Sequence, residues 1–105
     1  MEKLLEKHIL KQILEYLPYI GIFAWRTNSG VIFSEGRPHR MAPRGTSDII
    51  GIMPNGLFLA IEVKKPGGVV SQFQKEFLEK ITTKGGVGFV AYSLDDVIEK
   101  LKHGS

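Results

Sequence analysis

The sequence contains no cysteine and no long apolar run. The absence of cysteine among 105 residues excludes disulfide cross-links, thiol catalysis and cysteine-based zinc or iron–sulfur sites. No apolar run approaches the roughly 20 residues that a membrane-spanning helix requires. Glu2 and Glu6 interrupt the N-terminal stretch where a signal peptide would have its apolar region. We therefore expect a single cytoplasmic domain over residues 1–105, with 103–105 as a frayed tail and with no membrane partner.

Most of the chain carries no net charge. The net charge is +3 at pH 7, and residues 1–25 (three Lys, three Glu) and 46–105 (seven Lys, seven acids) each sum to zero. The whole excess lies in residues 26–45, where all four arginines face a single acid, Glu35. Guanidinium groups bind phosphate oxygens through two parallel hydrogen bonds. The segment therefore predicts a phosphate-containing partner.

The apolar pattern predicts an α/β fold. Helices are expected over residues 2–17, where Pro18 ends the helix, over 71–83, with Phe73 pointing inward, and over 93–102. Strands are expected over 22–26, 31–33, 48–53, 57–64 and 87–92. The 31–33 strand is expected to run back along the 22–26 strand after a turn at 28–30. Residues 34–46 are expected to form a functional loop with at most a short strand inside it. The helix between the last two strands implies a crossover, so these strands should be parallel within a mixed sheet.

Asp48 and Glu62 are candidate ligands of a divalent cation. Side chains alternate across a strand, so Glu62 and Lys64 share the face opposite their apolar neighbours. A three-residue loop at 54–56 would place Asp48 opposite Glu62, whereas a two-residue loop at 55–56 would place the carboxylates on opposite faces. We favour the three-residue loop. Two adjacent carboxylates repel unless a cation joins them, and hard ions such as Mg²⁺ prefer oxygen ligands.

Each candidate also has a purely structural interpretation. A Glu-x-Lys pair on a strand is commonly a solvated ion pair, and Glu6 can be an ordinary surface glutamate like Glu2. Ser71 and Gln74 have the spacing of a capping box, which is compatible with a catalytic role. Trp25 is expected to pack in the core or along its strand rather than to stack on bases. Together, beside an arginine-rich loop, the candidates favour a metal-dependent phosphodiesterase.

Four motifs occur in the order and at the spacing of one nuclease family. They are Arg26-x-Asn28-x-Gly30, Gly45-x-Ser47-Asp48-Ile49-x-Gly51, Ile61-Glu62-Val63-Lys64-Lys65-Pro66-Gly67 and Ser71-x-x-Gln74-x-x-Phe77. From about residue 6 to about residue 93, the chain resembles a VRR-NUC domain, the virus-type replication-repair nuclease branch of the PD-(D/E)XK superfamily. The superfamily's Pro-Asp is Ser-Asp here, which is usual for this branch. The resemblance implies a restriction-endonuclease-like αβββαβ core with a mixed sheet flanked by helices.

The resemblance also implies a metal site that uses Mg²⁺ or Mn²⁺. Asp48 and Glu62 match the metal-binding carboxylates, with the backbone carbonyl of Val63 as a third ligand. Lys64 matches the catalytic lysine, which orients the attacking water or offsets charge that develops on the phosphate. Glu6 matches the first-helix glutamate, which holds a metal-bound water or a second ion.

The remaining matches concern the second helix and the DNA. Gln74 matches the family's glutamine that lies near the catalytic lysine. The arginine segment leads directly into Asp48, so it is expected to clamp phosphates that flank the cut, and nothing in the sequence resembles a base-reading helix. The expected DNA contacts are Arg26, Arg37, His39, Arg40, Arg44 and Lys65.

The function that the resemblance implies is a metal-dependent, structure-specific DNA endonuclease that acts on branched or structured DNA. Because the domain is small, we expect a homodimer that resolves Holliday junctions by two symmetric cuts. Nicking or flap cleavage by the same site is the nearer alternative, and a non-catalytic DNA-binding module on the same scaffold is the other. By the same resemblance, a viral origin would place the protein in the host cytoplasm.

Overall fold

The computed structural model describes residues 2–27, 31–40 and 42–104. The first helix, α1, spans Glu2–Tyr16 and continues into a 3-10 helix, η1, over Leu17–Ile20. Pro18 ends the α-helix as predicted, because it lies in the first turn of η1, where its missing N–H is not needed. Gly21 then turns the chain with a left-handed φ of 80°. Among the described residues, no helix is both long enough and apolar enough to cross a bilayer.

A four-stranded mixed sheet forms the centre of the fold. Its strands are β1 (Phe23–Arg26), β4 (Ile49–Ile52), β5 (Phe58–Val63) and β6 (Val87–Ala91), in the order β1-β4-β5-β6. The β1–β4 and β4–β5 pairs are antiparallel, and the β5–β6 pair is parallel. The crossover helix α2 spans Gln72–Thr83. The predicted fold class and the predicted parallel pair are therefore confirmed.

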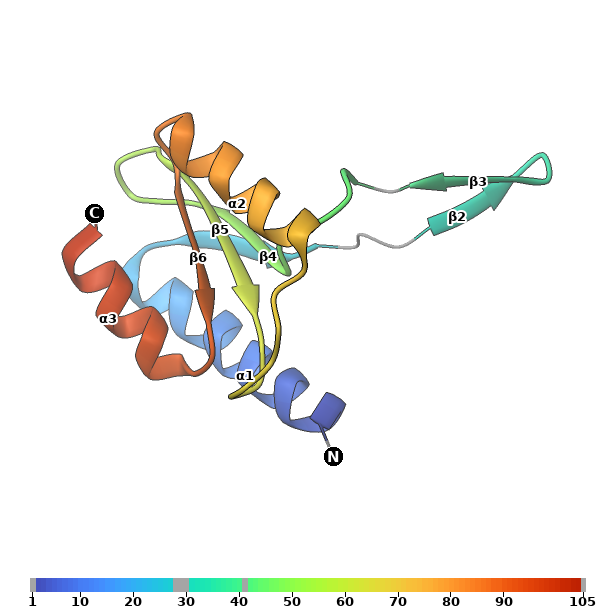
Figure 1. The fold of residues 1–105 in the computed structure, drawn as a ribbon. Helices are drawn as coiled ribbons and strands as arrows, with labels where there is room; N and C mark the ends of the chain where they lie inside the picture. Colours follow the sequence, from blue (N-terminus) through green and yellow to red (C-terminus); the bar gives the residue numbers. More distant parts are fainter. Residues whose placement is uncertain (1, 28–30, 41, 105) are drawn as a thin grey trace.

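Helices cover both faces of this sheet (Figure 1). The larger buried cluster joins α1 and α3 (Leu94–Gly104) to one face, with Ile13, Ile49 and Ile61 fully buried. The smaller cluster packs Leu78 of α2 onto Ile50 and Ala60 on the other face. Odd and even residues of β4 and β5 therefore point to different layers.

The β4–β5 turn has the register predicted for a three-residue loop. Ile49 pairs with Ile61 and Ile52 with Phe58, so the pairing is symmetric about Asn55. The Asn55 side chain accepts a hydrogen bond from the Leu57 amide at 3.1 Å, which holds the turn. Continuing this register by one position sets Asp48 opposite Glu62.

The arginine segment departs from the prediction. Strands β2 (Val31–Ser34) and β3 (Arg37–Arg40) pair with each other in a separate two-stranded sheet, so residues 31–33 do not return along β1. Glu35 and Gly36 both have positive φ, 55° and 72°, as the tight turn of a hairpin requires. The pair projects away from the body as an arm (Figure 1). The turn predicted at 28–30 lies outside the described residues.

Two aromatic side chains are less buried than the sequence suggested. Trp25 packs along its strand against Phe23, with ring centroids 5.4 Å apart, but it is 45% exposed and not a core residue. Phe73 was expected to point inward and is 48% exposed. It lies in the first turn of α2, where the guanidinium of Arg44 covers its ring at 4.8 Å. Trp25 is exposed because the apolar contacts of α2 are with Ile50, Ala60 and Val90, and Phe73 lies outside the cluster through which α2 packs on the sheet.

Candidate active site

Asp48 and Glu62 meet at one end of the sheet. Oδ2 of Asp48 accepts a hydrogen bond of 2.8 Å from the amide of Val63, the residue after Glu62. Asp48 is two residues from Ile50, and Glu62 is two residues from Ala60. Because side chains alternate along a strand, both carboxylates lie on the face that α2 covers. The structure thus brings the two predicted carboxylates together.

Glu62 is far more buried than a surface ion pair would be. Its residue is 2% exposed, because the first turn of α2 covers this part of β5. The side-chain amide of Gln74 donates to Oε2 of Glu62 at 2.9 Å, and Nζ of Lys64 lies 3.8 Å from the same oxygen. Oε1 is buried and has no hydrogen-bond partner among the described residues.

The surroundings of Glu62 disfavour its negative charge. The pKa of the Glu62 carboxyl is raised from 4.5 to about 8, chiefly by burial and then by the charge of Asp48 and a side-chain hydrogen bond with it. Lys64 acts in the opposite direction, and Glu6 contributes a small further increase in the pKa. Glu6 of α1 is therefore close enough to act on Glu62 electrostatically. An added cation near Glu62 would favour the ionised form.

The donor set fits a divalent ion such as Mg²⁺. A buried, unpartnered carboxylate oxygen beside a second carboxylate is what a hard cation would satisfy. In the described parts of the chain no cluster of three or more His, Cys, Asp or Glu side chains is found. Mg²⁺ is commonly held by one or two carboxylates, with waters and substrate phosphates completing its shell. Two carboxylates are therefore sufficient protein ligands of this type.

Gln74 caps α2, as the Ser71–Gln74 spacing predicted, and it also contacts Glu62. Its side-chain Oε1 accepts a hydrogen bond from the Ser71 backbone amide at 2.8 Å, while the Gln74 backbone amide donates to Oγ of Ser71 at 3.2 Å, completing a capping box. The same side chain donates through Nε2 to Glu62. The N-terminus of α2 is thereby fastened to the candidate site.

Thr27 and Gly45 also position the site, although the sequence did not single them out. Oγ1 of Thr27 donates to the Ser47 carbonyl at 2.7 Å, and its amide donates to the Asp48 carbonyl at 2.8 Å. Gly45 has a φ of 84°, and a Cβ there would overlap the Phe73 carbonyl and lie 2.9 Å from the Gln74 nitrogen. Gly45 was part of a quoted motif, but its close approach to α2 is visible only in the fold.

The predicted DNA contacts fall into two groups. Arg44, in the segment before Asp48, lies against Phe73 in the first turn of α2, and Lys65 directly follows Lys64. Exposed side chains on β3 form the second group on the arm: Arg37, His39 and Arg40. Arg37 and Arg40 are three positions apart on a strand and so project from opposite faces of the arm. Arg26 pairs with Ile49 and so points to the face of the sheet opposite Glu62.

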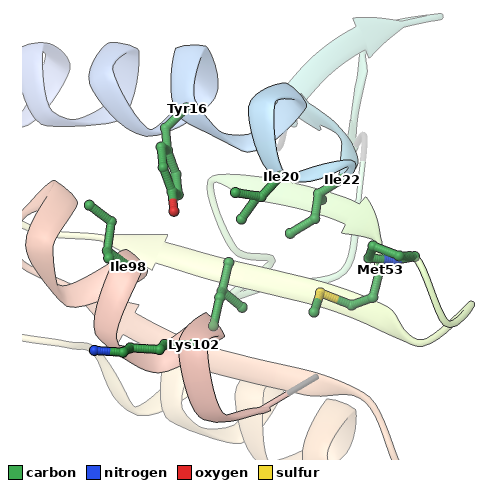
Figure 2. Close-up of a pocket in the computed structure, with 8 residues that line it drawn as sticks. Tyr16, Ile20, Ile22, Met53, Ile98 and Lys102 are labelled. Atoms are coloured by element: carbon green, nitrogen blue, oxygen red, sulfur yellow. The ribbon is translucent and has the colours of Figure 1, made fainter.

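A separate apolar pocket lies at the other end of β4. It has a volume of about 240 Å³ and is bordered by Tyr16, Ile22, Met53 and Ile98 among others (Figure 2). Met53 follows β4, whereas Asp48 precedes it. The pocket is therefore not part of the carboxylate site.

Comparison with known proteins agrees with the geometry. The chain matches the VRR-NUC domain over residues 3–95, which includes every candidate catalytic residue. No curated protein and no solved structure matches it. The match covers most of the 105 residues. The chain belongs to the VRR-NUC domain family of the PD-(D/E)XK superfamily and is a DNA-binding nuclease domain.

Proposed function

We propose that the protein is a metal-dependent DNA endonuclease that hydrolyses phosphodiester bonds at the Asp48–Glu62 site. The observation that carries this proposal is the buried Glu62 carboxylate, which has one unpartnered oxygen beside Asp48 and a lysine 3.8 Å from the other. A buried carboxyl group with a strongly raised pKa beside a second carboxylate is typical of functional sites, and a bound cation would satisfy its free oxygen. Mg²⁺ or Mn²⁺ is the proposed cofactor.

The proposed ligands are Asp48, Glu62 and the Val63 carbonyl. The Val63 amide points toward Asp48, and the N–H and C=O of one strand residue point to the same side, so its carbonyl faces Asp48 as well. Glu6 would act through a water molecule or a second ion, since its influence on Glu62 is electrostatic. A divalent ion bound there supplies Lewis-acid activation of the phosphate and of the attacking water.

Lys64 and Gln74 have distinct proposed roles. The Lys64 ammonium, 17% exposed at the edge of the site, would orient the attacking water or offset negative charge on the phosphate. Gln74 is a positioning residue, because it holds Oε2 of Glu62 and leaves Oε1 for a cation. Together they fix which oxygen of Glu62 is available.

Branched DNA is the proposed substrate, and a homodimer the proposed active form. The β2–β3 arm carries exposed arginines away from the body, so one subunit can contact DNA beyond the duplex that it cuts. Resolution of a Holliday junction requires two symmetric cuts and therefore two sites. A single chain, however, contains the complete proposed residue set, which favours nicking or flap cleavage if the protein is monomeric.

A cleavage panel tests the proposal. The protein is incubated with a four-way junction, a flap, a nicked duplex and supercoiled plasmid, each with Mg²⁺, Mn²⁺ or EDTA, and its mass is measured in solution. We expect cleavage with either metal, none with EDTA, and none from Asp48→Asn or Glu62→Gln despite native circular dichroism. Cleavage by either variant, or salt-sensitive binding without cleavage by the wild type, would contradict a catalytic role.

A further inference from the structure

Two aromatic rings are exposed on the sheet face that carries the candidate site. Phe23 is 71% exposed and Trp25 is 45% exposed, and their rings contact each other at an interplanar angle of 51°. Across the sheet, Ile52 pairs with Phe23 and Phe58 pairs with Ile52, and both are also exposed. We call Phe23, Trp25, Ile52 and Phe58 the aromatic patch.

The patch begins beside the carboxylates. Trp25 pairs with Ile50, so Asp48, two residues before Ile50, is its diagonal neighbour on the adjacent strand. Diagonal neighbours on one face of a sheet are about 7–8 Å apart, within reach of an aromatic side chain. α2 leaves this part of the face uncovered, because its apolar contacts are with Ile50, Ala60 and Val90. Trp25 is therefore an exposed ring next to the proposed point of cleavage.

This distance matches the spacing of nucleotides along a strand. Neighbouring nucleotides of one duplex strand rise by about 3.4 Å along the axis, so the diagonal spacing between the positions of Trp25 and Asp48 corresponds to about two base steps. Arg44, whose guanidinium lies over Phe73 in the first turn of α2, adds positive charge to the segment that leads into Asp48. A strand positioned for cleavage thus brings a nearby nucleotide to the patch.

The chemistry of an aromatic ring selects for unpaired bases. In a paired duplex both faces of each base are stacked on neighbours, whereas an unpaired base offers a free π-face that stacks on Trp or Phe without regard to sequence. We propose that Trp25, supported by Phe23, stacks on an unpaired base beside the scissile phosphate, an inference that rests on the proposed nuclease function. The preferred substrates are therefore DNAs with unpaired nucleotides at the cut, such as a flap, a bubble or a junction opened at its crossover.

The fluorescence of Trp25 provides a direct test. Trp25 is the only tryptophan in the chain, so its emission reports on stacking without interference. The inactive Glu62→Gln variant is titrated, with Mg²⁺ present, with a duplex containing a two-nucleotide bubble and with the fully paired duplex of the same sequence. We expect strong quenching by the bubble and weak quenching by the paired duplex. Equal quenching, or none, overturns the proposal.

Variants separate stacking from general binding. Trp25→Leu keeps an apolar side chain but removes the ring, and we expect bubble affinity to fall about 5- to 100-fold, as the loss of one base–aromatic stack predicts. Trp25→Phe should retain most of the preference. Tyr19→Leu removes a ring that is 88% exposed in η1, before β1, and it should retain the preference for bubble over paired DNA. An unchanged bubble-to-paired ratio in Trp25→Leu contradicts the proposal.

The same experiments distinguish the proposal from its alternatives. If wild-type protein binds bubble DNA with quenching but never cleaves, the nuclease assignment fails and the stacking role stands. If it cleaves while Trp25→Leu keeps the bubble preference, the nuclease assignment stands and the stacking role fails. If Trp25→Leu instead converts a dimer to a monomer at equal concentration, the patch is an interface between copies of the chain, and the stacking proposal is overturned.

Discussion

The side-chain amide of Gln74 donates a hydrogen bond of 2.9 Å to Oε2 of Glu62 while its oxygen caps helix α2. One side chain therefore couples the start of a helix to a buried carboxylate. The bond occupies one oxygen of Glu62 and leaves the other for a cation. We expect Gln74 to act through Glu62 and not through contact with DNA.

Replacing Gln74 separates these two functions. Gln74→Glu keeps an acceptor at the capping-box position but replaces the donor with a third carboxylate, which should raise the pKa of Glu62 further. Because such supporting contacts typically change metal affinity or activity by about 10- to 100-fold, we expect cleavage to fall in that range and to need more Mg²⁺. Cleavage rates across a Mg²⁺ titration measure this effect.

Ser71→Ala is the matched control, because it removes the cap and leaves the Gln74–Glu62 hydrogen bond intact. Loss of an N-cap costs about 1 kcal/mol of stability, which urea unfolding measures. We expect Ser71→Ala to keep the wild-type Mg²⁺ requirement. An equal loss of activity in both variants would mean that capping alone explains Gln74.

The raised pKa of Glu62 predicts an unusual dependence of stability on pH. Without metal, folded Glu62 keeps its proton up to a pKa of about 8, whereas the unfolded chain loses it near 4.5. The folded state then binds more protons, so the free energy of unfolding falls as the pH rises between these values. The loss is at most about 5 kcal/mol. Urea unfolding in EDTA at pH 5, 6.5 and 8.5 measures it.

Glu62→Gln should remove this dependence, because glutamine does not titrate. Above pH 8 in EDTA we expect it to be more stable than the wild type, and the exposed Glu79→Gln on α2 to behave like the wild type. Mg²⁺ should stabilise wild-type protein most above pH 8 and Glu62→Gln little, since a ligand stabilises only the state that it binds. If the free energy of unfolding changes with pH in the same way for the wild type and Glu62→Gln, burial of Glu62 is not the cause of the pH dependence.

Gly45 holds the segment before Asp48 against helix α2. Gly45→Ala must adopt a φ of 84° and also displace the backbone at Phe73 and Gln74. Gly85→Ala has a similar φ of 90° with no atom within 4 Å of the added Cβ, so it should cost only the left-handed penalty of about 1–2 kcal/mol. We expect Gly45→Ala to lose more stability than Gly85→Ala and, unlike it, most cleavage. Equal losses would show that this contact is unimportant.

The sequence predicted the parts of the site that depend on local rules. The sequence left a two-residue and a three-residue loop open, and the favoured three-residue loop at 54–56 correctly gave the β4–β5 register that sets Asp48 opposite Glu62. The Ser71–Gln74 capping box followed from spacing alone. These features were predictable because they are fixed by contacts between residues close in the sequence.

The features that were not predicted depend on tertiary contacts. A Glu-x-Lys pair on a strand suggests an exposed face, and only the packing of α2 makes Glu62 a buried carboxylate. Glu35 in a left-handed conformation is an unusual residue for a tight hairpin turn, so the arm was taken for a loop. Thr27 and Gly45 act through residues 20 or more positions away, and no local pattern marks such contacts.

The division of the arginines between the site and the arm predicts different effects on DNA binding. Each phosphate contact contributes about 0.9 to the slope of log affinity against log salt concentration. Removing Arg37 and Arg40 together should therefore lower the slope by about two, on any DNA sequence. Arg44→Ala should lower it by about one. Fluorescence anisotropy at several salt concentrations measures these slopes in EDTA, where no cleavage occurs.

Arg44→Lys distinguishes charge from geometry at the same position. It keeps the positive charge, so the salt slope should remain near that of the wild type, but it loses the planar guanidinium that covers Phe73 at 4.8 Å. If that contact holds the segment before Asp48 in place, cleavage at saturating DNA falls in Arg44→Lys and in Phe73→Leu alike. Arg37→Lys, on the arm, keeps charge without such a contact and should cleave as the wild type does. If Arg44→Lys and Arg37→Lys are indistinguishable, Arg44 serves only as a charge.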